Sequence, residues 1–151
     1  MLSDGRIREL IDEGEIGVEG IGDLDRQLSS STLDLRVASD YKRPATNEVF
    51  TAENNDGNII LEPQTFYHMH TTEEIYLPDY IHGSTEEVMT LALDGIRVAT
   101  GAVHPGYDQG YLVLAVENRS EKSKMLEVGE NIVQITFHRL ESSAESEYDG
   151  E

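Results

Sequence analysis

The chain has 151 residues, 38% of them hydrophobic, so it is long enough to bury the core of one globular domain. Its 30 acidic and 11 basic residues give a formal charge of -19, which excludes the basic surface that binding to nucleic acid or to an anionic membrane requires. The absence of cysteine excludes disulfides, thiolate metal sites and a cysteine nucleophile. The first residues contain neither a basic segment nor a long apolar run, so we expect a cytoplasmic protein.

The acidic composition predicts a halophilic protein. Only Lys42, Lys122 and Lys124 are lysines, so carboxylates and arginines form the charged surface. At molar salt the Debye length shrinks to roughly 3 Å, which removes the repulsion between carboxylates. An ordinary acidic protein is the alternative interpretation.

The first predicted element is a helix capped by Ser3, with Ile7, Leu10 and Ile11 at helical spacing and Gly14 at its end. After it, the chain changes to short apolar runs separated by Gly, Pro, Asn and Asp. The predicted strands span residues 33–37, 58–61, 65–69, 75–77, 111–116 and 131–137. This spacing is typical of a mostly antiparallel sandwich or barrel.

Three further segments complete the predicted order. Residues 38–58 are polar and contain turn signals, so they predict an excursion with a hairpin turn inside the domain. Residues 84–93 predict one more helix, because Ser84 and Glu87 have the spacing of a capping box; its apolar residues cover most of its circumference, so we expect it to be buried. Residues 141–151 predict a solvated, flexible acidic tail after a domain over residues 1–140.

Four segments carry a family resemblance. Residues 99–114 read Ala-Thr-Gly-Ala-Val-His-Pro-Gly-Tyr-Asp-Gln-Gly-Tyr-Leu-Val-Leu, a tight turn followed by an alternating strand. The helix at the start of the chain, Ser-Thr-Leu-Asp-Leu-Arg at 31–36 and Val-Gly-Glu-Asn-Ile-Val-Gln-Ile-Thr-Phe at 128–137 match in the same order. Over residues 1–140 the chain therefore resembles the family of dCTP deaminases and trimeric dUTP diphosphatases.

The resemblance implies a fold, an assembly and a ligand. The expected fold is mostly β, a distorted jelly-roll or β-clip barrel with an N-terminal helix and one short internal helix. The expected assembly is a homotrimer. The expected ligand is a pyrimidine deoxynucleotide, which Mg²⁺ accompanies if the protein is active; no other cofactor and no metal-binding residue are predicted.

The triphosphate motif of the family, Gly-Arg-Ser-Ser-x-x-Arg-x-Gly, falls on residues 87–95. Val88 and Leu93 take the places of its two arginines and Glu87 that of its first glycine, so only Thr90 keeps a hydroxyl in the motif. A triphosphate would meet apolar side chains and a carboxylate instead of two cations. The resemblance thus predicts a degenerate triphosphate site, and a core helix at a subunit contact is the alternative role for this segment.

Two residues are candidate bases. Ala115 stands where the deaminases have the glutamate that activates the attacking water, and Glu117 lies two residues on, on the same strand face but about 7 Å away. His104 replaces the aspartate of the diphosphatase turn, and an imidazole can accept a proton near neutral pH. A solvated carboxylate and a turn histidine without a catalytic role are the alternatives.

Part of the nucleoside pocket of the family is kept. Gly101, Gly106 and Tyr107 stand where that pocket forms, and Tyr107 aligns with the aromatic residue that packs on the deoxyribose. Gln134 keeps the glutamine of the last strand. A core tyrosine and a buried amide are the alternatives. The acidic end of the chain stands where family members fold a basic segment over the phosphates, so this lid is expected to be absent or greatly shortened.

Three functions stay open. The leading hypothesis is a protein of pyrimidine deoxynucleotide metabolism with a degenerate triphosphate site and weak or no catalysis. The second is an active dUTP or dCTP hydrolase or deaminase that uses His104 or Glu117. The third is a non-catalytic module that senses deoxynucleotides or assembles trimers.

Overall fold

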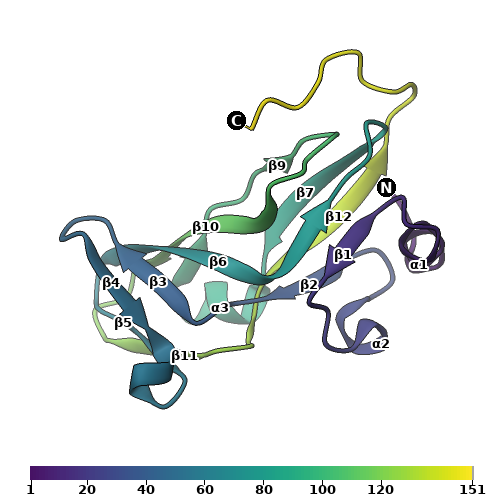
Figure 1. The fold of residues 1–151 in the computed structure, drawn as a ribbon. Helices are drawn as coiled ribbons and strands as arrows, with labels where there is room; N and C mark the ends of the chain where they lie inside the picture. Colours follow the sequence, from purple (N-terminus) through teal and green to yellow (C-terminus); the bar gives the residue numbers. More distant parts are fainter. Residues whose placement is uncertain (151) are drawn as a thin grey trace.

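Residues 1–150, which the computed structural model describes, form a mostly β protein with open sheets (Figure 1). The six-stranded sheet contains β1 (Gly17–Glu19), β3 (Asp40–Arg43), β4 (Glu48–Thr51), β6 (Thr65–Tyr76), β8 (Ile96–Val98) and β10 (Gly110–Asn118). The four-stranded sheet contains β2 (Leu33–Arg36), β7 (Ile81–Glu87), β9 (Ala102–Val103) and β12 (Asn131–Arg139). A third sheet pairs β5 (Asn58–Leu61) with β11 (Lys124–Glu127).

The strand order brings distant segments together. It runs β4-β3-β6-β10-β8 in the large sheet, with β1 added on β6, and β2-β12-β7-β9 in the four-stranded sheet. The strand pairs are antiparallel, as predicted. The predicted strands 65–69 and 75–77 are one continuous strand, β6, because β1, β3 and β10 pair with successive parts of it.

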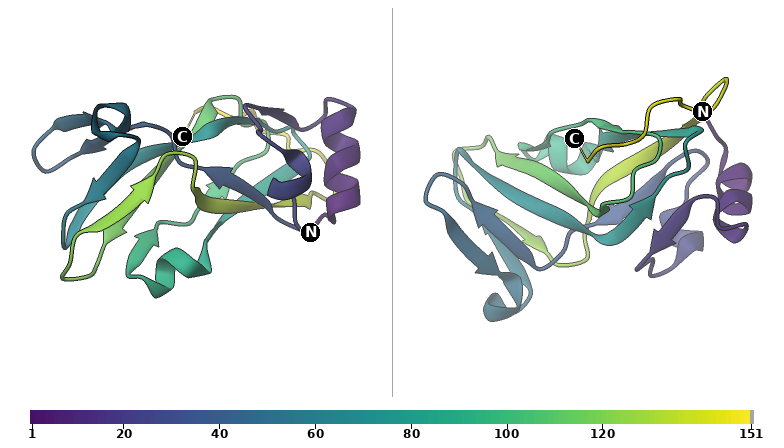
Figure 2. Two further views of the ribbon diagram at one scale, coloured as in Figure 1. Left: turned by 90° about the horizontal axis from the view of Figure 1, so that it is seen from below. Right: turned by 45° about the horizontal axis from the view of Figure 1, so that its top comes forward.

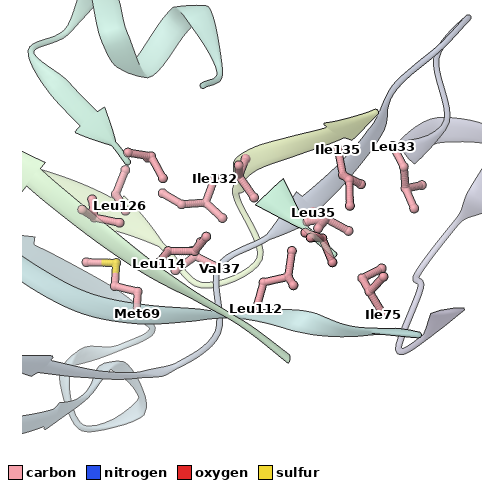
Figure 3. Close-up of a cluster of buried hydrophobic side chains, with 14 of the residues drawn as sticks. Leu33, Leu35, Val37, Met69, Ile75, Leu112, Leu114, Leu126, Ile132 and Ile135 are labelled. Carbon is pink, nitrogen blue, oxygen red and sulfur yellow. The ribbon is translucent and has the colours of Figure 1, made fainter. Parts of the chain in front are cut away.

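One face of each main sheet supplies the hydrophobic core (Figure 3). Along β10, Leu112, Leu114 and Val116 are buried, whereas the alternating residues Tyr111, Val113 and Ala115 are exposed. This alternation follows from the period of two in a strand. The labelled core residues of Figure 3 come from both main sheets, from β11 and from Val37, which directly follows β2: Leu33, Leu35, Val37, Met69, Ile75, Leu112, Leu114, Leu126, Ile132 and Ile135.

The predicted N-terminal helix is confirmed as α1 (Asp4–Asp12). Ile7 and Leu10 are buried, and Gly14 has a φ of 76°, a left-handed conformation that favours glycine after a helix. Ser3 takes the N-cap position without a side-chain capping bond. The chain start is fixed to the last strand by the bond from Leu2 N to Phe137 O, 2.7 Å. Figure 2 shows α1 and the β3–β4 hairpin at opposite ends of the molecule.

The predicted short internal helix is confirmed over Met89–Leu93, but its predicted start at residue 84 and its predicted burial are wrong. Residues up to Glu87 belong to β7, which pairs with β12 over seven residues, and the helix α3 (Met89–Leu93) begins only afterwards. α3 buries none of its residues, and Met89 and Leu93 are 69% and 81% exposed. Residues 84–87 form a strand and not a helix because they pair with β12. Burial of Thr85 and exposure of Glu86 follow the period of two that is typical of a strand.

The excursion at residues 38–58 is confirmed as the β3–β4 hairpin followed by the 3-10 helix η1 (Ala52–Asn55). The structure also contains a short helix that the sequence did not suggest, α2 (Leu24–Gln27), whose first turn is capped by the Asp23 carboxylate accepting from Asp25 N at 3.1 Å. None of the helices in residues 1–150 is long and apolar enough to cross a membrane.

A buried carboxylate joins the two main sheets. Glu73 on β6 is fully buried, and its carboxylate accepts bonds from Arg36 Nε at 2.6 Å, Arg36 N at 2.9 Å and Gln27 Nε2 at 3.0 Å. Arg36 lies on β2, so this ion pair connects the six-stranded sheet to the four-stranded sheet. Removing one partner of such a pair leaves the other charge without compensation in a largely buried site.

We therefore expect Glu73→Ala to lower the free energy of unfolding by about 3–5 kcal/mol. Glu53→Ala, on the exposed surface of η1, is the matched control and should change it by less than about 0.5 kcal/mol. Urea denaturation followed by circular dichroism measures both. Equal effects of the two substitutions would contradict a stabilising role of the buried carboxylate.

Three histidines form a row across the four-stranded sheet. His82 on β7 faces His138 on β12, with 6.4 Å between ring centroids, and His104 after β9 lies on the other side at 6.2 Å. Thr136 Oγ1 lies 3.2 Å from His138 Nε2. Burial lowers the pKa of His82, and the neighbouring imidazoles lower it further. The fold therefore favours the neutral form of His82.

This pKa shift predicts acid sensitivity. Above the unfolded pKa, about 6.5, His82 is neutral in both states, and stability falls as the pH drops from there toward the lower folded pKa. Between about pH 7.5 and 5.5, we expect the free energy of unfolding to fall more in the wild-type protein than in the His82→Gln variant. Denaturation curves at both pH values test this, with His68→Gln on β6 as the control. An identical loss in wild type and His82→Gln would refute the prediction.

Candidate functional site

The candidate site is built around the turn between β9 and β10. Gly106 has a φ of 83°, and a Cβ on it would meet Tyr148 Cβ at 3.3 Å, so this position requires glycine. Gly106 N donates to Pro78 O at 3.0 Å, and Leu77 N donates to Tyr107 O at 2.9 Å. These bonds fix the turn against the end of β6.

A cavity of about 650 Å³, here called the tyrosine cleft, lies between this turn, the exposed face of β10 and the C-terminal tail. Its lining includes Tyr107, Tyr111 and Tyr148, together with Gly101 and His104. The volume suits a ligand of nucleoside size, and aromatic side chains provide flat apolar surfaces for a heterocycle or a sugar.

Tyr107 is held in place from two sides. Its hydroxyl donates to Tyr111 O at 2.8 Å, and its ring lies 5.4 Å from the ring of Tyr148. Burial raises the pKa of Tyr107 to about 12, and Tyr148 and the carboxylate of Asp108 contribute to the increase. The phenol is therefore uncharged at neutral pH.

A second cavity of about 300 Å³, here called the charged cavity, adjoins the tyrosine cleft. Arg97 donates to Glu87 through Nε and a terminal nitrogen, both at 2.7 Å, and Arg119 Nε lies 3.2 Å from Glu117 Oε2. The bond from Arg97 lowers the pKa of Glu87, and the backbone N–H of Val98 lowers it further. Both guanidinium groups that line this cavity are thus paired with carboxylates.

The two cavities meet at Ala99, Thr100 and Ala115, which line both of them. None of these three side chains can act as a base near neutral pH. Glu117, on the same face of β10, lines the charged cavity, and His104 lines the tyrosine cleft. The two candidate bases therefore lie in different cavities on either side of Ala115.

The other predicted ligand-binding residues fall into two groups, those at the tyrosine cleft and those that line neither cavity. Gly101 and Tyr107 line the tyrosine cleft, and Gly106 contacts Tyr148, which also lines it. Thr90 is exposed on α3 and lines neither cavity. Gln134 lies on β12, opposite Asp34 and Glu86 on the neighbouring strands, and lines neither cavity within this chain.

The C-terminal tail lies against the turn. Ala144 N donates to Asp79 O at 2.9 Å, and Tyr148 and Gly150 line the tyrosine cleft. Figure 1 shows this segment running back from the end of β12 across the edge of the four-stranded sheet. Sequence reasoning missed Tyr148, because a single aromatic residue in an acidic segment has no periodicity. It also missed Tyr111, which the alternation along β10 does place on the same face as Ala115.

The histidines do not assemble a metal site. Within residues 1–150, no three His, Asp or Glu side chains form a group that could hold a metal ion. His68 lies 6.0 Å from Phe66 and His70 lies 5.3 Å from Tyr111, measured between ring centroids.

Comparison with known sequences identifies relatives along the whole chain. Residues 1–140 match the family model described as dCTP deaminase-like. A protein named dCTP deaminase from Thermococcus kodakarensis is 34% identical over 150 residues, which cover 99% of this chain and 90% of that protein. A protein of the same name from Pyrococcus abyssi is 35% identical with the same coverage, and one named "dCTP deaminase, dUMP-forming" from Methanothermobacter thermautotrophicus is 29% identical over 167 residues.

Solved structures share the fold. The 2'-deoxycytidine 5'-triphosphate deaminase from Agrobacterium tumefaciens superposes with a TM-score of 0.74 at 21% identity, over 90% of this chain and 46% of that one. The dUTPase of EIAV superposes with a TM-score of 0.60 at 16% identity, over 89% of this chain and 97% of that one. The agreement of family model, relatives and fold shows that this chain belongs to the dCTP deaminase-like family of pyrimidine nucleotide metabolism.

Proposed function

We propose that this protein keeps the ligand cleft of the dCTP deaminase-like family and has weak or no catalysis on deoxynucleoside triphosphates. The observation that carries the proposal is the junction at Ala115, where the two cavities meet without a side chain that could activate water. The resemblance puts the catalytic glutamate of the deaminases at this position.

The charges around the junction support the proposal. A triphosphate brings three to four negative charges, which require several uncompensated cations. The two nearby guanidinium groups, of Arg97 and Arg119, already bind Glu87 and Glu117. Freeing Arg97 for a phosphate would break two bonds of 2.7 Å and leave a carboxylate beside the ligand.

One observation favours the second candidate, an active hydrolase or deaminase. Glu117 lines a cavity directly beside Ala115, and its partner Arg119 is 59% exposed in its side chain, so their pairing is weak. In this candidate Glu117 or His104 would take the proton from water, and Mg²⁺ would accompany the phosphates. This candidate requires the substrate to bind at a different position along β10 from the one that the resemblance implies.

An activity assay separates the two candidates. With magnesium and molar salt, we expect turnover of dCTP at least about 1,000-fold slower than by the Thermococcus kodakarensis protein named dCTP deaminase, since loss of a general base alone costs about 10²–10⁴-fold. We expect turnover of dUTP to be equally weak. Ala115→Glu should not restore turnover, because the triphosphate still meets no free cation. Turnover comparable to the relative that disappears in Glu117→Ala or His104→Ala would instead establish the second candidate.

We also infer that the chain assembles as the homotrimer that the family resemblance implies. The helix α3 supports this, because it exposes Met89 and Leu93, and apolar side chains exposed side by side in one short helix favour burial against another copy. A cytoplasmic location and adaptation to high salt stay predictions from the sequence.

This assembly predicts that Leu93→Glu shifts the protein from trimer toward monomer, because a carboxylate would have to be buried at the contact. Val49→Glu is the matched control, since Val49 is 72% exposed on β4 and away from α3. Sedimentation velocity measures the distribution. Trimers that persist unchanged in Leu93→Glu, or a monomeric wild type, would contradict the proposed contact.

A further inference from the structure

A cavity of about 620 Å³, here called the hairpin cavity, lies at the β3–β4 hairpin, at the opposite end of the molecule from α1 (Figure 2). Its lining comes from the hairpin (residues 41–51), from η1 (54–55) and from residues 60–67, where β5 leads into β6. In the described part of the chain it shares no lining residue with the tyrosine cleft or the charged cavity. A ligand bound there would therefore be independent of the proposed function.

Aromatic side chains form one wall of the hairpin cavity. Tyr41 and Phe50 are cross-strand partners whose rings stack with 5.0 Å between centroids, and Tyr67 lies edge-on to Tyr41 at 5.8 Å. The hydroxyls of the two tyrosines accept bonds from the backbone N–H groups of Ile60 at 3.4 Å and Glu62 at 2.9 Å. Because strand pairing and these bonds fix the rings, the wall is ready to pack against an apolar or aromatic group.

Arg43 supplies a cation to the same cavity. It stands two residues after Tyr41 on β3, so the period of two in a strand places both on one face of the hairpin. The side chain is partly buried, and its Nε is buried without a hydrogen-bond partner. Within residues 1–150 its guanidinium forms no ion pair. Since a dehydrated donor without an acceptor costs free energy, this guanidinium is suited to bind a carboxylate.

Two carboxylates line the hairpin cavity as well. Glu48 is the cross-strand partner of Arg43, and Glu62 directly follows β5. Both residues are exposed, and among the described residues neither carboxylate forms an ion pair. The lining thus presents one positive and two negative groups that do not pair with one another. A ligand with a single charge would be attracted by one kind of group and repelled by the other, whereas a ligand with both charges would be attracted by both.

We infer that the hairpin cavity binds a zwitterionic amino acid with an aromatic or other apolar side chain. Arg43 would donate to its carboxylate, and Glu48 and Glu62 would accept from its ammonium group. The stacked rings of Tyr41 and Phe50 would pack against its side chain. Such a molecule carries both charges next to an apolar group, which is the combination that this lining presents.

Calorimetry on the full-length wild-type protein at neutral pH tests the charge requirement. The ligands are L-phenylalanine, 3-phenylpropionate, which lacks the ammonium group, and phenethylamine, which lacks the carboxylate. We expect phenylalanine to bind and each analogue to bind at least about tenfold more weakly, because each loses hydrogen bonds to a charged group. Glycine, which has both charges and no ring, should also bind at least about tenfold more weakly.

The variant Arg43→Gln assigns the positive charge. It should weaken the binding of phenylalanine by about tenfold and should not weaken that of phenethylamine, which has no carboxylate to lose a partner. Lys42→Gln is the matched control, since it removes an exposed positive charge from the neighbouring residue on the opposite face of β3. It should leave the binding of phenylalanine unchanged.

A second variant assigns the negative charges. Glu48→Gln combined with Glu62→Gln should weaken the binding of phenylalanine by about tenfold and should not weaken that of 3-phenylpropionate. Glu121→Gln combined with Glu141→Gln is the control, because it removes two exposed carboxylates that do not line the cavity and keeps the net charge of the two variants equal.

The wild-type comparison decides the inference even if a variant fails to fold. Absence of phenylalanine binding overturns it, and so does an analogue or glycine that binds as tightly as phenylalanine. Equal weakening of phenylalanine binding in a variant and in its matched control also overturns it, because overall charge would then explain the effect. The proposed function is judged by turnover of dCTP alone, so either conclusion can fail without the other.

Discussion

The alternation of side chains along β10 is the constraint on which the rest of the site depends. Because Leu112, Leu114 and Val116 must face the core, Tyr111, Val113 and Ala115 must face outward. The neighbouring strands β6 and β8 hold this register, so the floor of both cavities is fixed by the packing behind it. A ligand cleft can therefore keep its outline whatever side chains its outer face carries.

This separation of core from cleft means that the chain can keep the fold of its family whichever side chains face the cleft. An alanine at position 115 creates no cavity in the core, since the side chain points away from it. The same holds for α3, onto which the resemblance places the triphosphate motif of the family, because its apolar residues are not buried in this chain. Changes at both places cost the fold little, in contrast to any change at the buried carboxylate of Glu73.

The charge of the site depends on which side chains form ion pairs there more than on the overall charge of the chain. The chain carries 11 basic residues, yet the two that line the charged cavity are bound by Glu87 and Glu117. The C-terminal tail adds Tyr148 to the cleft and brings Asp149 beside it, where the family resemblance leads to a basic lid. Both features place carboxylates close to the groups that line the two cavities.

The sequence by itself determined the mostly β architecture, the helix at the start and the turn that carries Gly106 and Tyr107, because local periodicity and turn chemistry encode them. It could not decide residues 84–87, whose spacing fits both a capping box and a strand; only pairing with β12 made them β7. Nor could it reveal the Arg97–Glu87 pair or the contact of Tyr148 with Tyr107, which join residues 10 or more positions apart. Such long-range contacts depend on which strands and which part of the C-terminal tail lie next to one another in the fold. A local sequence pattern does not contain this information.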